Sequence, residues 1–381
     1  MGWLFFWLAM LLFAHPADDA PVRAIEAALE RGRPNEALAL LERSDLRLDE
    51  FDRLIYRARA ESALGNWAAA RKALQRAVRQ RPEDAPARLR LGCALAALRS
   101  DAQAVEQFEA AAALGLDSFE LHLEWARVAA RRGNLLGQCR VVQIAAPGGR
   151  PPEPGQIIDR TVVLESAAGN NQAVVCDSSA ALYHALRAVA LRADAAAPIP
   201  VPDAGRDDAS APPATGGDDG RATGEAWLII GKAWQEAARP RSAAEAYRRA
   251  VAELSGPERD AAYEKLAAAY LELDDFDAYF SCLRRRQSEG AGLDRPRLAA
   301  AYSRAAAAMA ERGDLAGQIR YLRLAQEIEP KADRHVALGD ALALDGRPRE
   351  AAVHWRAALE LRPDHPQRSA LLARIRRAES E

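Results

Sequence analysis

The residue types that most often carry chemistry are few in this chain and stand far apart. The four cysteines are Cys93, Cys139, Cys176 and Cys282, and the six histidines are His15, His122, His184, His335, His354 and His365. The sequence has no C-x-x-C pair for zinc or dithiol exchange, and no H-E-x-x-H pair that would place two metal ligands on one helix face. It also lacks a glycine-rich phosphate loop and a G-x-S-x-G nucleophile turn. We therefore expect neither a metal site nor a cofactor.

One pair of residues could still support catalysis. Cys176 stands just before a predicted helix over residues 179–194, and that helix carries His184. A thiol near a helix N-terminus can have a lowered pKa, and a neighbouring imidazole can accept its proton. The spacing matches no known Cys-His protease signature. A cysteine-dependent enzyme using Cys176 and His184 is therefore an alternative to a structural cysteine with a solvent-facing histidine.

The cysteines also have two structural interpretations. Free cysteine is among the most buried residue types, so these thiols are expected mainly as small apolar core residues. An even number of cysteines in an exported protein is also compatible with two disulfides. The spacing along the chain does not choose a pairing.

The composition excludes some classes of ligand and favours helices. The chain has 381 residues, 49% of them hydrophobic, and its 52 basic and 54 acidic side chains leave a net charge of -2. A balanced charge gives no positive field to hold phosphates or anionic lipid, so nucleic acid is not expected as a ligand. Alanine, leucine, arginine and glutamate, the strongest helix formers, are frequent. An almost entirely helical chain is expected.

The first residues contain an unbroken apolar run from Trp3 to Ala14. The run is shorter than the ~20 residues that a helix needs to cross a bilayer, and it fits the apolar core of a secretory signal. Residues 1–17 are therefore predicted to be a signal peptide or a short apolar anchor. We expect export to the periplasm or cell envelope of a bacterium, and an uncleaved segment would keep the protein close to the membrane.

A pattern of small and apolar residues recurs along the chain with a nearly constant step. Gly32 and Gly65 are 33 residues apart, Ala70 and Ala104 are 34 apart, and Pro363 follows 33 residues after Pro330. Each unit contains two segments with helical apolar spacing, separated by a short polar turn. A period of this length indicates stacked helical hairpins.

The residues at fixed places in these units resemble those of tetratricopeptide repeat (TPR) proteins. The two best copies contain Trp227, Ile230, Gly231, Trp234, Ala243, Tyr247 and Ala250, and then Leu338, Gly339, Ala351, Trp355, Ala358 and Pro363. Small residues such as Gly339 and Ala351 would lie where the two helices of a hairpin cross. The resemblance implies an all-α, TPR-type α-solenoid of helical hairpins.

The repeat pattern predicts two blocks with an irregular middle segment. Residues 18–150 form the N-terminal TPR block, and residues 224–365 form the C-terminal block. Between them, residues 151–194 have no clean helical period apart from one helix. Residues 195–223, rich in Pro, Gly, Ala and Asp, are predicted to be a flexible linker. Residues 366–381 read as a capping helix that would cover the last apolar face.

The resemblance also implies where partners bind. In the family, the first helices of successive repeats line a concave groove that holds peptides or partner helices. Transferred to this chain, the candidate groove residues are Arg59, Arg127 and Arg131 in the first block, and Lys232 and Gln235 in the second. The arginines could bind carboxylates, although they could equally be solvated surface residues. The Lys and Asn with which some members hold a C-terminal carboxylate are replaced here by Arg59, Cys93 and Arg127.

These observations favour a non-enzymatic adaptor or scaffold whose partners are proteins or peptides. A stack of hairpins offers a large preformed surface, and a flexible linker would let two such surfaces act together. A structural spacer with empty grooves is a further alternative.

Overall fold

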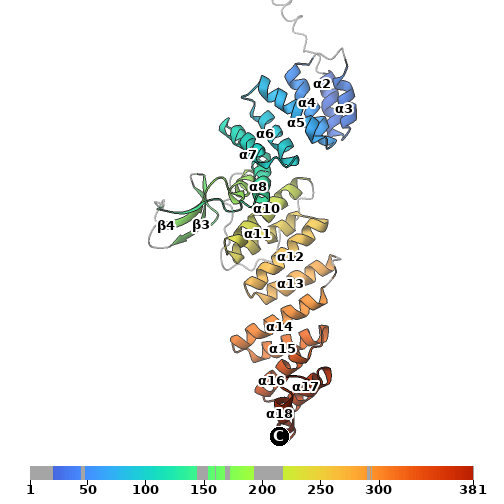
Figure 1. Ribbon diagram of the computed structural model, residues 1–381, viewed down its shortest axis with the longest axis vertical. Coiled ribbons are helices and arrows are strands. Elements are labelled where there is room, and N and C mark those ends of the chain that lie inside the picture. Colours follow the sequence, from blue (N-terminus) through green and yellow to red (C-terminus); the bar gives the residue numbers. More distant parts are fainter. Residues whose placement is uncertain are drawn as a thin grey trace, which may run out of the picture. The chain divides into compact units, whose positions relative to one another are not determined.

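The computed structural model describes residues 20–43, 48–143, 153–158, 160–167, 172–192, 218–289, 292 and 294–380 (Figure 1). The predicted signal or anchor segment and most of the predicted linker lie outside these residues. The chain divides into two compact units, Met1–Asp203 and Ala204–Glu381, with the division inside the predicted linker.

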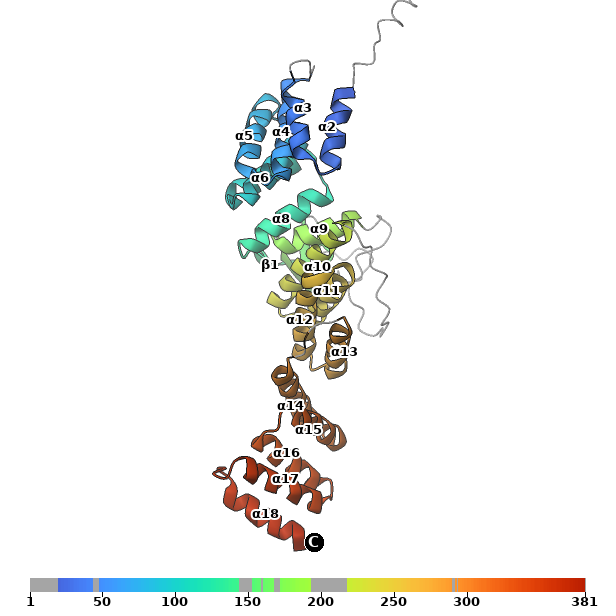
Figure 2. The same ribbon diagram turned by 90° about the vertical axis from the view of Figure 1, so that its right-hand side faces the viewer.

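The helices of the first unit form antiparallel hairpins, as the repeat pattern predicts. They are α2 (Ala20–Glu30), α3 (Pro34–Leu41), α4 (Glu50–Ala63), α5 (Trp67–Gln80), α6 (Ala85–Ala97), α7 (Asp101–Ala113), α8 (Phe119–Arg131) and α9 (Ala181–Arg192). The blue helices α2 to α5 stand side by side in Figure 2. Each even-numbered helix packs against the helix that follows it.

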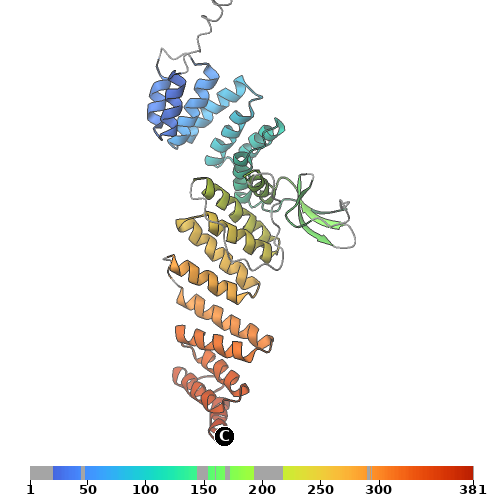
Figure 3. The same ribbon diagram turned by 180° about the vertical axis from the view of Figure 1, so that it is seen from behind.

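A small β-sheet is inserted between the two helices of the last hairpin in this unit. Its strands are β1 (Cys139–Gln143), β2 (Ile157–Ile158), β3 (Thr161–Ala167) and β4 (Gln172–Cys176), in the antiparallel order β1-β4-β3-β2. Figure 3 shows the sheet, in green, projecting from the helices of its unit. The sequence predicts an irregular segment only for residues 151–194, whereas β1 lies within the predicted N-terminal block of residues 18–150. The short valine- and isoleucine-rich runs of the sheet favour strands, but a bulge between Val163 and Glu165 interrupts the alternation expected of one.

A polar cluster built on two buried histidines, His122 and His184, holds α9 against α8 despite the insertion. The Nδ1 atoms of His122 and His184 are 2.9 Å apart, and His122 Nε2 lies 2.8 Å from Asp117 Oδ1. Since a neutral His122 must donate its Nε2 proton to the carboxylate, His184 donates between the two Nδ1 atoms. Asp117 also pairs with Arg187 of α9, and the His184 ring stacks on Trp125 at a centroid distance of 4.0 Å. These contacts close the hairpin without a short turn.

The second unit continues the repeat pattern. Its helices are α10 (Asp218–Glu236), α11 (Pro240–Glu253), α12 (Gly256–Glu272), α13 (Phe276–Ser288), α14 (Arg295–Glu311), α15 (Leu315–Ile328), α16 (Ala332–Leu344), α17 (Pro348–Leu361) and α18 (Arg368–Ser380). Helix α18 occupies the predicted capping segment, with Leu371 and Ile375 buried. Helix α10 begins at Asp218, six residues before the predicted start of the C-terminal block at residue 224.

Small residues permit the close crossing of helices within each hairpin. A Cβ added at Gly339 would lie 2.5 Å from Trp355 Nε1 and 3.1 Å from the Ala351 carbonyl oxygen. Gly92 meets the Phe108 ring in the same way, and Gly231 meets the Tyr247 ring. The crossing predicted at Gly339 and Ala351 is therefore confirmed.

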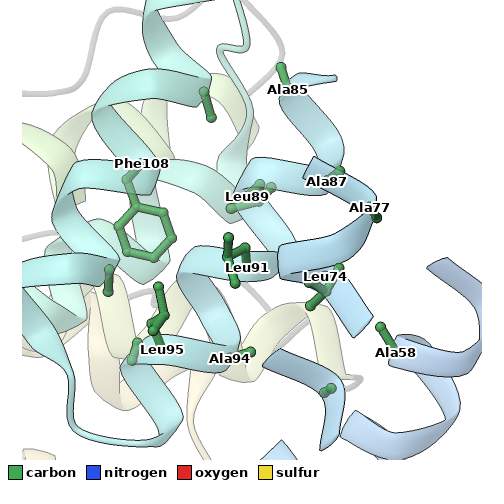
Figure 4. Close-up of a cluster of buried hydrophobic side chains, with 14 of the residues drawn as sticks. Ala58, Leu74, Ala77, Ala85, Ala87, Leu89, Leu91, Ala94, Leu95 and Phe108 are labelled. Carbon is green, nitrogen blue, oxygen red and sulfur yellow. The ribbon is translucent and has the colours of Figure 1, made fainter. Parts of the chain in front are cut away.

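The apolar core runs through successive hairpins. In the first unit, Leu74 of α5, Leu91 and Ala94 of α6 and Phe108 of α7 belong to one buried cluster (Figure 4). Alanine supplies much of this core, so neighbouring helices approach closely. Among the described helices, none combines the length and apolar character needed to span a bilayer.

We predict that Gly339→Ala destabilises the chain by about 1–3 kcal/mol, because the added methyl group overpacks the crossing at Trp355. The loss should appear even though alanine favours a helix by about 1 kcal/mol over glycine. Urea unfolding followed by circular dichroism measures it. The matched control is Gly292→Ala, where a Cβ meets no heavy atom within 4 Å; equal stability of the two variants would contradict the prediction.

The histidine cluster predicts a pH dependence of stability in α8 and α9. Burial lowers the pKa of His122 and, more strongly, that of His184. The folded state therefore resists protonation, whereas histidines in the unfolded chain take up protons as the pH falls below about 6.5. The contribution of the neutral histidines to the free energy of unfolding is complete above that pH. It declines as the pH falls toward the pKa values of the two histidines in the folded state. Amide hydrogen exchange in α8 and α9, corrected for the intrinsic rate, should be faster at pH 5.5 than at pH 7.5.

His184→Phe should weaken this pH dependence, because a phenyl ring can stack on Trp125 but does not titrate. His354→Phe, which changes the second stacked histidine pair, in α16 and α17, should leave exchange in α8 and α9 unchanged. A pH dependence in α8 and α9 that His184→Phe does not alter would disprove the assignment.

Candidate partner-binding groove

The first unit contains a groove along the first helices of its hairpins. The cavity has a volume of about 640 Å³ and is lined by residues of α2, α4, α5, α6 and α8. Its lining residues are Leu29, Glu30, Ala58, Arg59, Ser62, Ala63, Trp67, Leu74, Arg90, Cys93, Ala96, Ala97, Glu120, Glu124 and Arg131. Four of the five helices are the first members of hairpins, which is the side that the resemblance implies.

Arg131 lines this groove, but its guanidinium forms an ion pair with Asp101. Its Nη2 atom lies 2.6 Å from Asp101 Oδ1 and its Nε atom 3.2 Å from Asp101 Oδ2, and Nη2 also reaches the Ala96 carbonyl oxygen at 3.3 Å. The hydrogen bonds from Arg131 hold the pKa of Asp101 below its usual value. Because Ala96, Asp101 and Arg131 belong to three helices, this contact joins α6, α7 and α8.

Arg127 also has an internal partner. Its guanidinium forms an ion pair with Glu124 one turn earlier on α8, and Glu124 lines the groove. The two charges largely neutralise each other. Of the three arginines predicted for this groove, Arg127 and Arg131 therefore support its wall.

Arg59 and Arg90 are the arginines in the groove that remain available. Both are half-buried, and neither forms an ion pair with any residue that the structure describes. The Arg59 guanidinium lies 5.6 Å from the centre of the Tyr56 ring, which positions it by a cation-π contact. Arg90 was missed in the sequence analysis. It lies one turn before Cys93 on α6, so helical spacing could have indicated that it shares the face of Cys93.

The groove also has an apolar part. Trp67 is half-buried beside Leu74 and Cys93. Burial raises the pKa of the Cys93 thiol, which therefore stays protonated and acts as a packing group. The groove thus combines two available cations with an aromatic and aliphatic surface.

The two predicted groove residues of the second unit, Gln235 and Lys232, differ in their surroundings. Gln235 donates to Glu272 Oε1 at 2.8 Å and accepts from the Tyr247 hydroxyl at 3.1 Å, which links α10, α11 and α12. Lys232 is exposed; desolvation by the surrounding protein lowers its pKa, and the like charge of Lys265 lowers it further. Neither Lys232 nor Gln235 lines the 260 Å³ cavity between α12, α13 and α14.

The enzyme-like pair is not assembled in the described part of the chain. His184 bonds to His122, and among the described residues no hydrogen bond joins it to Cys176. Cys176 is fully buried in the sheet, and this burial raises its pKa to about 12. A catalytic thiol that must be ionised at neutral pH needs the opposite shift.

Comparison with known proteins supports the repeat assignment. The sequence model described as "Tetratricopeptide repeat" matches residues 51–92, which comprise α4, α5 and the first part of α6. No curated protein matches this chain.

Three similar solved structures can be named. The APC/C hetero-tetramer Cut9-Hcn1 is 13% identical, with a TM-score of 0.33, over 98% of this chain and 57% of that chain. A tetratricopeptide repeat protein from Parabacteroides merdae is 12% identical, with a TM-score of 0.35, over 87% of this chain and 99% of that one. Naa15/Naa10 bound to HypK-THB is 12% identical, with a TM-score of 0.49, over 87% of this chain and 40% of that one.

The family match covers a single stretch, and the hairpins before and after it supply the rest of the evidence. Helices α2 to α9 and α10 to α17 pair in sequence order. Three of these crossings, at Gly92, Gly231 and Gly339, carry the glycine and aromatic ring of the family pattern. The described chain therefore has an all-α, TPR-type fold into which a small sheet is inserted, and its residues 51–92 are similar to the tetratricopeptide repeat family.

Proposed function

We propose that this protein is an adaptor or scaffold that binds a segment of a protein partner in the groove of the first unit. The observation that carries the proposal is the difference between the arginines there. Arg131 and Arg127 are held in ion pairs, whereas Arg59 and Arg90 line the cavity without an acidic partner among the described residues. Two half-buried cations gain from an anion that enters the groove.

The chemistry of the groove favours a particular kind of segment. A partner carboxylate, from an acidic side chain or a chain terminus, would bind between Arg59 and Arg90, since guanidinium binds carboxylate through paired hydrogen bonds. The half-buried Trp67 offers an apolar surface for a neighbouring side chain. Glu30 and Glu120 also line the cavity and would repel a uniformly acidic peptide. The favoured ligand therefore has one acidic group beside apolar residues.

The construction of the groove supports tight binding of such a segment. Its walls are packed helices held by contacts such as Arg131 with Asp101, so the binding side has little ordering entropy to lose. The second unit offers another helical surface that includes Lys232. If residues 195–217 act as a tether, the two units could bind two parts of one partner at raised effective concentration.

The proposal assigns no catalytic role to the chain. The buried, protonated state of Cys176 and the engagement of His184 with His122 support a structural role for both residues. We also propose export to a bacterial periplasm or envelope, supported by the apolar run from Trp3 to Ala14. An uncleaved run would keep the protein near the membrane.

The double variant Arg59→Glu/Arg90→Glu is predicted to lose its partners. Each lost hydrogen bond to a charged group weakens binding by about 1.5–3 kcal/mol, so the dissociation constant should rise at least about tenfold. The measurement is quantitative mass spectrometry of proteins that co-purify with a tagged chain from its native cell. Binding of a peptide from the captured partner then gives the dissociation constant.

The matched control is Lys72→Glu/Arg79→Glu, which makes the same change in charge at exposed positions of α5 outside the groove. This variant should retain the partners of the wild-type protein. Equal partner lists for both double variants would exclude the groove and favour either the second unit or a spacer without a groove ligand. Circular dichroism confirms that both variants keep their helices.

A further inference from the structure

Two cysteines face each other at one end of the inserted sheet. In the antiparallel pair of β1 and β4, Cys139 is directly opposite Cys176, and this is the first of five paired positions. Opposite residues in such a pair place their side chains on the same face, with Cβ atoms about 4.5–5.5 Å apart. A disulfide needs a Cβ separation of about 3.5–4.5 Å, so a small approach of the two strands is sufficient.

The surroundings of this pair hold the two strand ends together. Asn134 Nδ2 donates to the Ser179 carbonyl oxygen at 3.0 Å, and the Ala181 amide donates to the Asn134 carbonyl oxygen at 2.9 Å. A Cβ added at Gly137 would lie 2.5 Å from Asp177 Oδ1, which shows how closely the two segments approach. The segments that join Cys139 to α8 and Cys176 to α9 are therefore held together by hydrogen bonds and close packing.

The two thiols differ in access, and the register selects this pair among the four cysteines. Cys139 is exposed, whereas Cys176 is fully buried. Cys93 lies in α6, and Cys282 lies in α13 of the other unit. Strand β1 is an edge strand that pairs with β4 alone, so it can shift toward Cys176 without breaking a second ladder.

We propose that Cys139 and Cys176 form a reversible disulfide that closes the base of the inserted sheet. The oxidant is a small or protein disulfide. The Cys139 thiolate attacks one of its sulfurs and releases a first thiolate, which leaves a mixed disulfide on Cys139. Cys176 then loses its proton and attacks the Cys139 sulfur, and the second half of the oxidant leaves as a thiolate. Two protein thiols become one disulfide, and the oxidant disulfide becomes two thiols.

The bond would fix an edge strand to the sheet. It would close a loop of about 38 residues that contains β1 to β4, which restricts the unfolded states of the insertion. An exported protein would meet oxidants of this class. The inference does not depend on partner binding in the groove, so either proposal can fail alone.

The test uses the full reduced chain incubated with oxidised glutathione. Remaining thiols are alkylated in denaturant, and the intact mass and proteolytic peptides are measured. We expect two alkylated cysteines, Cys93 and Cys282, and a mass lower by about 2 Da before alkylation, since two thiol hydrogens are lost. A linked peptide should contain Cys139 and Cys176, and a reductant should restore four alkylated cysteines.

Two variants sharpen the result. Cys93→Ser/Cys282→Ser should form the same linked peptide, whereas Cys139→Ser should leave Cys176 alkylated. Four alkylated cysteines after oxidation of the wild-type chain, a stable glutathione adduct on Cys139 alone, or a link to Cys93 or Cys282 would each overturn the proposal. Because the wild-type chain carries the decisive measurement, misfolding of a variant cannot hide the outcome.

Discussion

The close crossing of the two helices in each hairpin is the constraint on which the rest of the structure depends. A glycine in the first helix lets an aromatic ring of the second helix lie against its backbone, as at Gly92, Gly231 and Gly339. The ring fills a space that a side chain would otherwise occupy, and the helices then bury a shared apolar face. One hairpin has too little core to fold alone, so its remaining face must be covered by the next hairpin.

This packing also determines which charges can bind a partner. The first helices of the hairpins lie next to one another. An arginine on one of them can reach the preceding hairpin, as Arg131 of α8 reaches the Ala96 carbonyl oxygen of α6 and Asp101 of α7. Such contacts stabilise the stack, but the guanidinium group is then not available to bind a partner. Arg59 and Arg90 form no ion pair with a described residue, so we propose that the same residue type serves recognition there. The sequence shows the arginines but not their neighbours.

The fold could be predicted from the sequence because the crossing needs particular residues at a constant spacing. The candidate groove could be predicted only in part. Of the predicted arginines, Arg59 and Arg131 line the cavity and Arg127 does not, whereas Arg90 lines it but lies outside the pattern transferred from the family. The ion pair of Arg131 joins positions 30 residues apart that no periodicity relates. The sheet was missed because its strands are short and one contains a bulge. The contact between His122 and His184 spans 62 residues and follows from the insertion itself.

The insertion is tolerated because a hairpin is held by its helix faces and not by its turn. Helix α9 packs on α8 although the whole sheet separates them in sequence. A short turn keeps the entropic cost of bringing the two helices together low. This loop-closure cost grows only slowly with the length of the connection, so a long insertion adds little to it. The cluster of His122, His184, Asp117 and Arg187 offsets this cost with directional bonds that also fix the register of the helices. Burial lowers the pKa of both histidines, so the contact that replaces the turn is also sensitive to acid.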